Sequence, residues 1–221
     1  VRGLSLQRLA HVDAIAVDRE YMAKAGAEGL YPMIYYHHNI HFLAAASAYK
    51  GRYADSIKAA RELEASVKPH LKAMPMLEMF APYPIVSLVR FGRWDEVLKE
   101  PKPDESLKIT TGFWHFARGS AYVATKQTAN AEVELQALEA LIKTTPAEAR
   151  MFNNAATDIL NIADLELAGK IAFAKGDKQK GIALLSKAAA AEDATSYAEP
   201  ADWDLPVREV LGAALLSSND F

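Results

Sequence analysis

The sequence predicts an all-α protein, an α-solenoid of stacked antiparallel helical hairpins that forms one repeat domain over residues 1–221. Apolar residues recur with a period near 3.6, as Ile40 and Leu43 do, and this spacing places them on one face of a helix. No run of β-branched residues alternates between turn residues, as it would in a hairpin of strands. Because one helical hairpin cannot bury its own apolar face, each must stack on its neighbour.

A small residue, a short turn and an amphipathic stretch recur along the chain, which indicates an internal repeat. Gly169 precedes a turn at residues 175–177, and Gly181 follows it at a spacing that lets two helices cross closely. Another unit is shortened by Pro101 and Pro103. We expect hairpins over residues 5–31, 32–69, 76–100, 106–145, 157–193 and 206–221. The turns are expected at Gly51, Gly92, Lys126, Gly176 and Asn219.

The last expected hairpin contains only its first helix. Its apolar stripe consists of Val210, Leu211, Ala214 and Leu215. We therefore expect either that the sequence is a fragment of a longer protein, or that a second copy covers this stripe in a homo-oligomer. The first residue, Val1, is not an initiator methionine, which also favours a fragment.

The composition argues against several classes of protein. Hydrophobic residues make up 51% of the 221 residues, which is enough for a sizeable core and too many for a disordered chain. The 25 lysines and arginines are scattered among 28 acidic residues, so we expect no nucleic-acid partner. Cysteine is missing, and no apolar run is long enough for a membrane-spanning helix. We expect a soluble protein, cytoplasmic or periplasmic depending on what precedes Val1.

Several of these features resemble a known repeat. Small residues at the eighth and twentieth positions of a hairpin of roughly 34 residues, with a proline such as Pro146 near its end, are similar to the tetratricopeptide repeat. The tryptophan usual in the first helix is replaced in successive units by Ile40, His115, Leu165 and Arg208. The chain also resembles bacterial proteins of that superfamily with Tyr-Tyr-His-x-Asn-x-His-Phe and Glu-Pro-x-x-Trp segments, matched at residues 35–42 and 199–203. This resemblance implies a right-handed superhelix with a concave face, but no agreed activity.

The resemblance also implies which side chains line the concave face, because in such repeats the inner wall comes mainly from the first helix of each hairpin. The expected ligand-binding residues are Tyr35, His38, His41, Arg90, Phe113, Phe116, Glu166, Lys170 and Trp203, followed by Glu209 near the end. In this face Arg90 would serve as a bidentate donor and the aromatic rings as anchors for a protein or peptide.

A group of histidines at the start of one helix allows a second interpretation. His37 and His41 are four residues apart and His38 and His41 three apart, so either pair can share a helix face and bind a divalent metal. Glu78 is the best candidate for a carboxylate ligand. The alternative to a binding scaffold is therefore a metal-binding or metal-dependent hydrolytic site. Packing in the core, with the ring nitrogens satisfied by polar neighbours, is the commoner fate of such histidines.

Three further features have simpler explanations. Trp94 is expected to fill the gap after a turn, and the resemblance implies that His115 packs in the core. The segment from Tyr197 to Pro206 is too long for a simple turn, and either caps the groove or shields a junction between hairpins. No phosphate-binding glycine loop or nucleophile elbow is present, so we expect no catalytic residues and a non-catalytic scaffold that binds a protein or a peptide.

Overall fold

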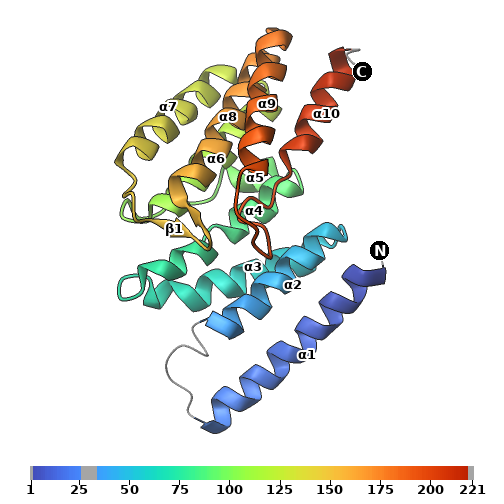
Figure 1. The fold of residues 1–221 in the computed structure, drawn as a ribbon, viewed down its shortest axis with the longest axis vertical. Helices are drawn as coiled ribbons and strands as arrows, with labels where there is room; N and C mark the ends of the chain where they lie inside the picture. The colour runs from blue at the N-terminus through green and yellow to red at the C-terminus, as the bar shows by residue number, and fades with distance from the viewer. Residues whose placement is uncertain (1, 26–33, 219–221) are drawn as a thin grey trace. The chain divides into compact units, whose positions relative to one another are not determined.

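A computed structural model describes residues 2–25 and 34–218, and it confirms that the protein is all-α (Figure 1). The chain divides into two compact units, Val1–Phe91 and Gly92–Phe221. The boundary falls inside the hairpin that we expected over residues 76–100. The first unit contains α1 Arg2–Ala25, α2 Tyr36–Tyr49, α3 Tyr53–Val67 and α4 Tyr83–Arg90, with short 3-10 helices at Lys68–His70 and Pro75–Phe80 between the last two.

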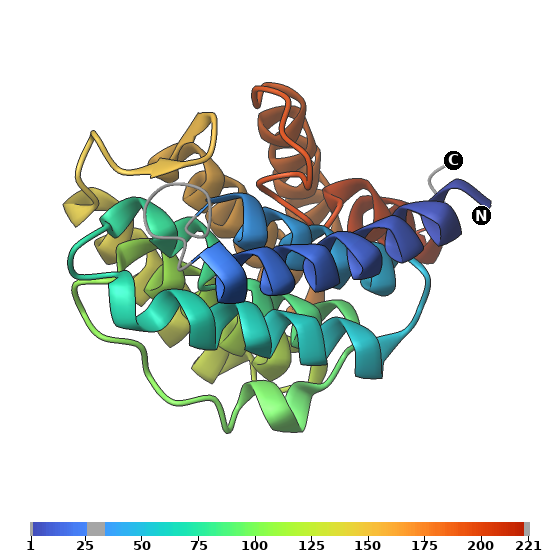
Figure 2. The ribbon, with the colours of Figure 1, turned by 90° about the horizontal axis from the view of Figure 1, so that it is seen from below.

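In the first unit each helix packs on the next, α1 on α2, α2 on α3 and α3 on α4. Figure 2 shows α1 running along α2. We expected a hairpin over residues 5–31, but residues 2–25 form one continuous helix, and the end of that hairpin lies outside the described residues. The core is mainly apolar, with Ile40, Ala44, Leu63, Leu77, Phe80 and Leu88 buried.

The second unit contains α5 Trp94–Val97, α6 Lys108–Ala124, α7 Thr128–Thr144, α8 Ala156–Ala174, α9 Lys178–Asp193 and α10 Val207–Ser218. Each helix from α5 to α9 packs on its successor in the chain, and α6 also packs on α8. Helix α5 ends after one turn, ahead of Pro101 and Pro103 as the sequence suggested. Two short antiparallel strands, β1 Arg150–Met151 and β2 Asn154–Ala155, precede α8. They lie between two expected hairpins, where the sequence had predicted no strand.

Four of the predicted turns carry a residue in the left-handed region of backbone space. The φ angles are 71° at Gly51, 61° at Gly92, 61° at Lys126 and 92° at Gly176. A residue of this conformation ends a helix by turning its last carbonyls toward following amides, and glycine adopts it without strain. The turns were therefore correctly predicted, with lysine in place of glycine at one of them. The fifth turn, at Asn219, lies outside the described residues.

Close helix crossings in the second unit depend on glycine. A Cβ atom on Gly181 would lie 3.0 Å from the backbone nitrogen of Phe173 and 3.1 Å from the carbonyl oxygen of Gly169, so α9 approaches α8 backbone to backbone. A Cβ on Gly119 would lie 2.5 Å from a methyl group of Leu167, where α6 meets α8. The approach at Gly181 is the close crossing that the sequence predicted, and the two approaches together fix the spacing of α6, α8 and α9.

Candidate functional site

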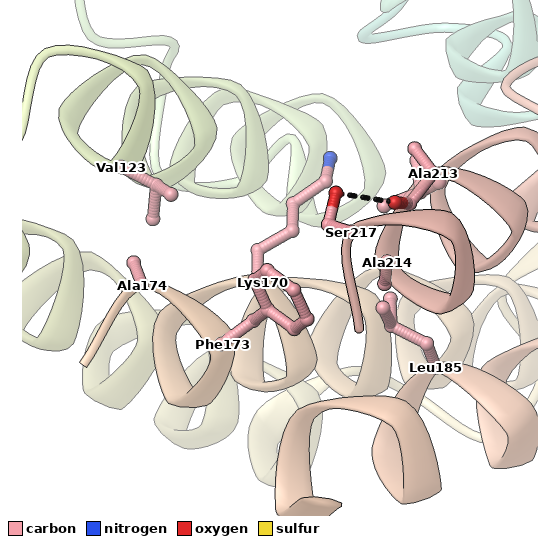
Figure 3. Close-up of a pocket in the computed structure, with 9 residues that line it drawn as sticks. Val123, Lys170, Phe173, Ala174, Leu185, Ala213, Ala214 and Ser217 are labelled. Atoms are coloured by element: carbon pink, nitrogen blue, oxygen red, sulfur yellow. Dashed lines mark hydrogen bonds between the residues drawn. The ribbon is translucent and has the colours of Figure 1, made fainter. Parts of the chain in front are cut away.

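A pocket of about 240 Å³ opens on the second unit where α10 meets α8 and α9 (Figure 3). It is lined by Val123, Lys170, Phe173, Ala174, Leu185, Val210, Ala213, Ala214 and Ser217. Carbon atoms form almost the whole wall, because only Lys170 and Ser217 carry a polar group in their side chains. The Ser217 hydroxyl donates to the carbonyl oxygen of Ala213, 2.7 Å away within α10. The pocket therefore presents an almost wholly apolar surface, with the stem of Lys170 in its wall.

The local sequence explains why space remains here. Val210, Ala213, Ala214 and Ser217 follow the spacing i, i+3, i+4, i+7, which places them on one face of α10. This face packs along α9, and Ala214 is buried. Because alanine side chains are short, they leave a hollow between α10 and the larger Phe173 and Leu185. The stripe that we expected to lack a partner is thus partly the wall of a pocket.

The ammonium of Lys170 is held by its neighbours on α6 and α8. Its Nζ lies 2.6 Å from a carboxylate oxygen of Glu166, 3.3 Å from the hydroxyl oxygen of Ser120 and 4.8 Å from the centre of the Phe116 ring. Glu166 is only 1% exposed, and its second carboxylate oxygen has no hydrogen-bond partner among the described residues. A charge in this setting is stabilised mainly by the opposite charge beside it. The pair therefore fixes the lysine stem along the pocket wall.

An aromatic cluster adjoins this ion pair. The indole of Trp203 packs on Phe113 and Phe116, with ring centres 5.4 and 5.0 Å apart. Trp203 is 3% exposed and does not line the pocket. The connection between α9 and α10, which carries it, therefore seats an aromatic side chain against α6. This arrangement fits the shielding role that we considered for the segment Tyr197 to Pro206.

The side chain of Asn154 forms hydrogen bonds with two residues of the same connection. Its amide nitrogen donates to the carbonyl oxygen of Ser196 at 3.1 Å and to a carboxylate oxygen of Asp202 at 2.6 Å, while its oxygen accepts from the Ser196 amide at 2.7 Å. Burial raises the pKa of Asp202 to about 6, although the hydrogen bond from Asn154 opposes this shift. The connection is therefore an ordered structure with a carboxyl group that titrates in the weakly acidic range.

Five of the residues expected on the concave face come together in the second unit. They are Phe113, Phe116, Glu166, Lys170 and Trp203. We expected an open wall, but all except Lys170 are buried, since Trp203 covers the two phenylalanine rings. Glu209 is exposed on α10. Lys170 is the member of this group that lines the pocket.

The expected site residues of the first unit lie in separate surroundings. Tyr35 is exposed, and the guanidinium carbon of Arg90 lies 4.2 Å from the centre of the Tyr49 ring. The ring of His38 packs on Phe42, with centres 4.5 Å apart.

His41, in contrast, is completely buried. Its ring meets Tyr83 edge to face at 4.0 Å and Phe80 at 5.6 Å. Burial, aided by the nearby His38, lowers the pKa of His41 to about 3. The imidazole is therefore neutral at physiological pH and belongs to the core.

The segment of residues 35–42 joins α2 to its neighbours. The Tyr36 hydroxyl accepts from Arg19 of α1 and donates to Glu62 of α3, at 3.1 Å in each case, and Arg19 also pairs with Glu62. His37 Nε2 lies 2.7 Å from the hydroxyl oxygen of Ser66. These contacts link three helices through one turn of α2.

Asn39 adds a second connection to α1. Its amide nitrogen donates to a carboxylate oxygen of Asp18 at 2.8 Å, and its oxygen lies 3.2 Å from His11 Nδ1. His11 in turn stacks on Phe42 at 4.7 Å. The polar residues of this segment thus have structural contacts that explain their spacing.

The metal alternative lacks an assembled ligand set. Within the described residues, no three histidine, cysteine, aspartate or glutamate side chains form a group that could hold a metal ion. His37 contacts Ser66, His38 packs on Phe42, and His41 is enclosed by aromatic rings. Glu78 is buried in the 3-10 helix Pro75–Phe80. Metal binding at these residues stays a prediction.

A polar network that the sequence did not reveal links α6 to α7. We expected His115 as a core aromatic residue, but it is half-buried, and its Nδ1 lies 2.7 Å from a carboxylate oxygen of Glu134. The other carboxylate oxygen accepts from Arg118 at 2.7 Å. Burial raises the pKa of Glu134, but the hydrogen bonds from His115 and Arg118 outweigh it, so the net shift is downward. This network is a structural joint between the two helices.

Comparisons with protein-family models, with curated proteins and with solved structures gave no match to this chain. The likeness to tetratricopeptide repeats therefore stays a resemblance of the sequence. Among the described helices, none is long and apolar enough to cross a membrane.

Proposed function

We propose that the chain is a non-catalytic scaffold that binds a peptide or a segment of another protein, and that the pocket between α8, α9 and α10 receives an apolar anchor side chain. The packing order of the second unit supports this proposal, because hairpins of a solenoid contact each other as α6 and α7 contact α8. We infer an α-solenoid with its binding surface on the side of α6 and α8 that carries Val123 and Lys170.

The size and lining of the pocket are the observation that carries the proposal. Its volume of about 240 Å³ lies below the range of about 300 to 1,000 Å³ that is typical of small-molecule sites. A space of this size suits one large apolar side chain. Anchors of this kind, inserted into a pocket of the partner, supply much of the affinity in protein recognition. Burying a leucine-sized side chain contributes about 2 kcal/mol.

A selection from random peptides displayed on phage tests the proposal. Ala213 lines the pocket and is exposed, so Ala213→Trp fills the space without a change in the core. Ala183, exposed on α9 and outside the pocket, provides the matched control Ala183→Trp. Selected peptides should bind the wild type and Ala183→Trp equally, and Ala213→Trp at least about tenfold more weakly.

Two outcomes would overturn the proposal. One is a selection that enriches no peptide on the protein over an uncoated surface. The other is a set of peptides whose dissociation constants are the same for the wild type and Ala213→Trp. Circular dichroism melts of the two tryptophan variants verify that each is folded.

A further inference from the structure

We infer that the segment bound in this pocket carries a carboxylate group next to its apolar anchor, so that the partner is an acidic peptide segment. This inference rests on the proposed function and specifies its ligand. It comes from two lysines, Lys170 in the pocket wall and Lys178 at the edge of the pocket.

Lys178 stands at the edge of the pocket. Its Nζ donates to the carbonyl oxygen of Ser217 at 3.2 Å and lies 6.0 Å from the centre of the Phe173 ring. Ser217 and Phe173 both line the pocket, so the ammonium lies where α9 and α10 border its opening. Lys178 is exposed, and an ammonium group has three N–H donors. It can therefore hold a partner oxygen while keeping its bond to α10.

The two lysines differ in their charge balance. The charge of Lys170 is matched by the buried carboxylate of Glu166. For Lys178, no acidic partner is present among the contacts of the described residues. The neighbouring Asp177 is occupied in capping α9, where it accepts from the Lys180 amide at 3.1 Å. The border of the pocket thus carries an exposed ammonium that no carboxylate of the described residues contacts.

Charge complementarity then selects the partner. A segment with aspartate or glutamate beside its apolar anchor places a carboxylate at Lys178 while the anchor enters the apolar space. A basic segment would bring like charges together. Because the pair is exposed, its effect on affinity is modest, about two- to fivefold, and it weakens as salt is added.

The peptides selected on the wild type provide the test, since the selection does not bias their charge. We expect them to share an apolar residue with aspartate or glutamate close by in sequence. Their dissociation constants should rise about two- to fivefold with Lys178→Gln, and similarly when the acidic residue of the peptide is changed to its amide. Lys187→Gln, also exposed on α9, is the matched control and should leave binding unchanged.

The outcomes separate this inference from the proposed function. Suppose that peptides bind Ala213→Trp more weakly than the wild type but lack acidic residues, or that neither Lys178→Gln nor salt changes their dissociation constants. The pocket then binds peptides, and the inference of an acidic partner is wrong. If no peptide distinguishes the wild type from Ala213→Trp, the proposed function itself fails. Light scattering tests whether a second copy of the chain occupies the pocket instead. If the wild type is a dimer and Ala213→Trp is a monomer, the pocket binds a second copy and the inference is wrong.

Discussion

The ammonium of Lys170 lies 2.6 Å from the carboxylate of Glu166, one turn earlier on α8, and this pair borders the pocket from the buried side. The lysine joins two features of the second unit, because its charged end also faces the Phe116 ring while its stem lines the apolar space. One side chain, that of Lys170, therefore contacts both the pocket and the aromatic cluster.

Removing one partner of this pair should be much more harmful than removing both. Lys170→Met leaves the Glu166 carboxylate buried without a counter-charge, and we expect a loss of about 3 kcal/mol in the free energy of unfolding. The double variant Lys170→Met with Glu166→Met should recover most of this loss. Urea unfolding at pH 7 measures both. Equal stabilities of the single and double variants would show that the ion pair is unimportant.

The buried carboxyl of Asp202 should make the second unit more stable in weak acid. Its pKa of about 6 is above the ordinary 3.8, so the folded protein binds the proton more tightly than the unfolded chain does. The ionised carboxylate therefore lowers the free energy of unfolding. This destabilisation is complete above pH 6 and disappears as the pH falls toward 3.8. Asp202→Asn should therefore raise stability at pH 7 by about 2 kcal/mol and have little effect at pH 4. A stabilisation that is the same at both pH values would contradict this.

The buried ring of His41 should make the protein less stable in acid, which is the opposite of the effect of Asp202. Its pKa of about 3 is below the ordinary 6.5, so the stability that comes from the neutral buried ring is full above pH 6.5 and is lost as the pH falls toward 3. We expect the ring signals of His41 in NMR spectra to stay unchanged between pH 8 and 5. The resonance that is present in the wild type and absent from the spectrum of His41→Phe is the one that belongs to His41. A titration of His41 near pH 6.5 would show that the ring is accessible to water.

The turn at Lys126 should be improved by glycine. Lys126 has a φ of 61°, a conformation that the other turns of this kind give to glycine. Lys126→Gly should raise the free energy of unfolding by about 0.5–1 kcal/mol, and the reciprocal change Gly176→Ala should lower it by a similar amount. Thermal melts of both variants check this. A lower melting temperature for Lys126→Gly would indicate that the lysine side chain has a contact that offsets the strain.

The helices and their turns were accessible from the sequence because they depend on local information. Apolar spacing identified the amphipathic stretches, and residues such as Gly51, Gly176 and Lys126 marked the points where the chain reverses. The close approach of α8 and α9 also followed from Gly169 and Gly181. Each of these features lies within a single helix or between consecutive ones.

The pocket could not be predicted in the same way. It forms where α10 comes close to Val123 of α6 and Lys170 of α8, which are far from α10 in the sequence. The apolar stripe of α10 was visible in the sequence, but its short alanines indicated packing as readily as a cavity. The open concave face was expected from a resemblance, whereas the burial of Phe113 and Glu166 depends on contacts distant in sequence.

The histidine group illustrates the same limit. The spacing of His37, His38 and His41 allows two rings to share a helix face, but the helix is packed on several sides. His37 turns to Ser66 of α3, and His41 is enclosed beside Tyr83 of α4. Which of two neighbouring helices a side chain meets is a property of the tertiary structure.

The most direct test of whether the pocket receives the peptide is an NMR measurement of intermolecular nuclear Overhauser effects. The methyl groups to observe are those of Val123, Leu185 and Val210, because these residues line the pocket from three different helices. We predict such effects from one apolar side chain of the peptide to all three residues, and their loss in Ala213→Trp. A peptide that binds tightly but shows its effects only to residues elsewhere in the chain would contradict the assignment of the pocket as the binding site.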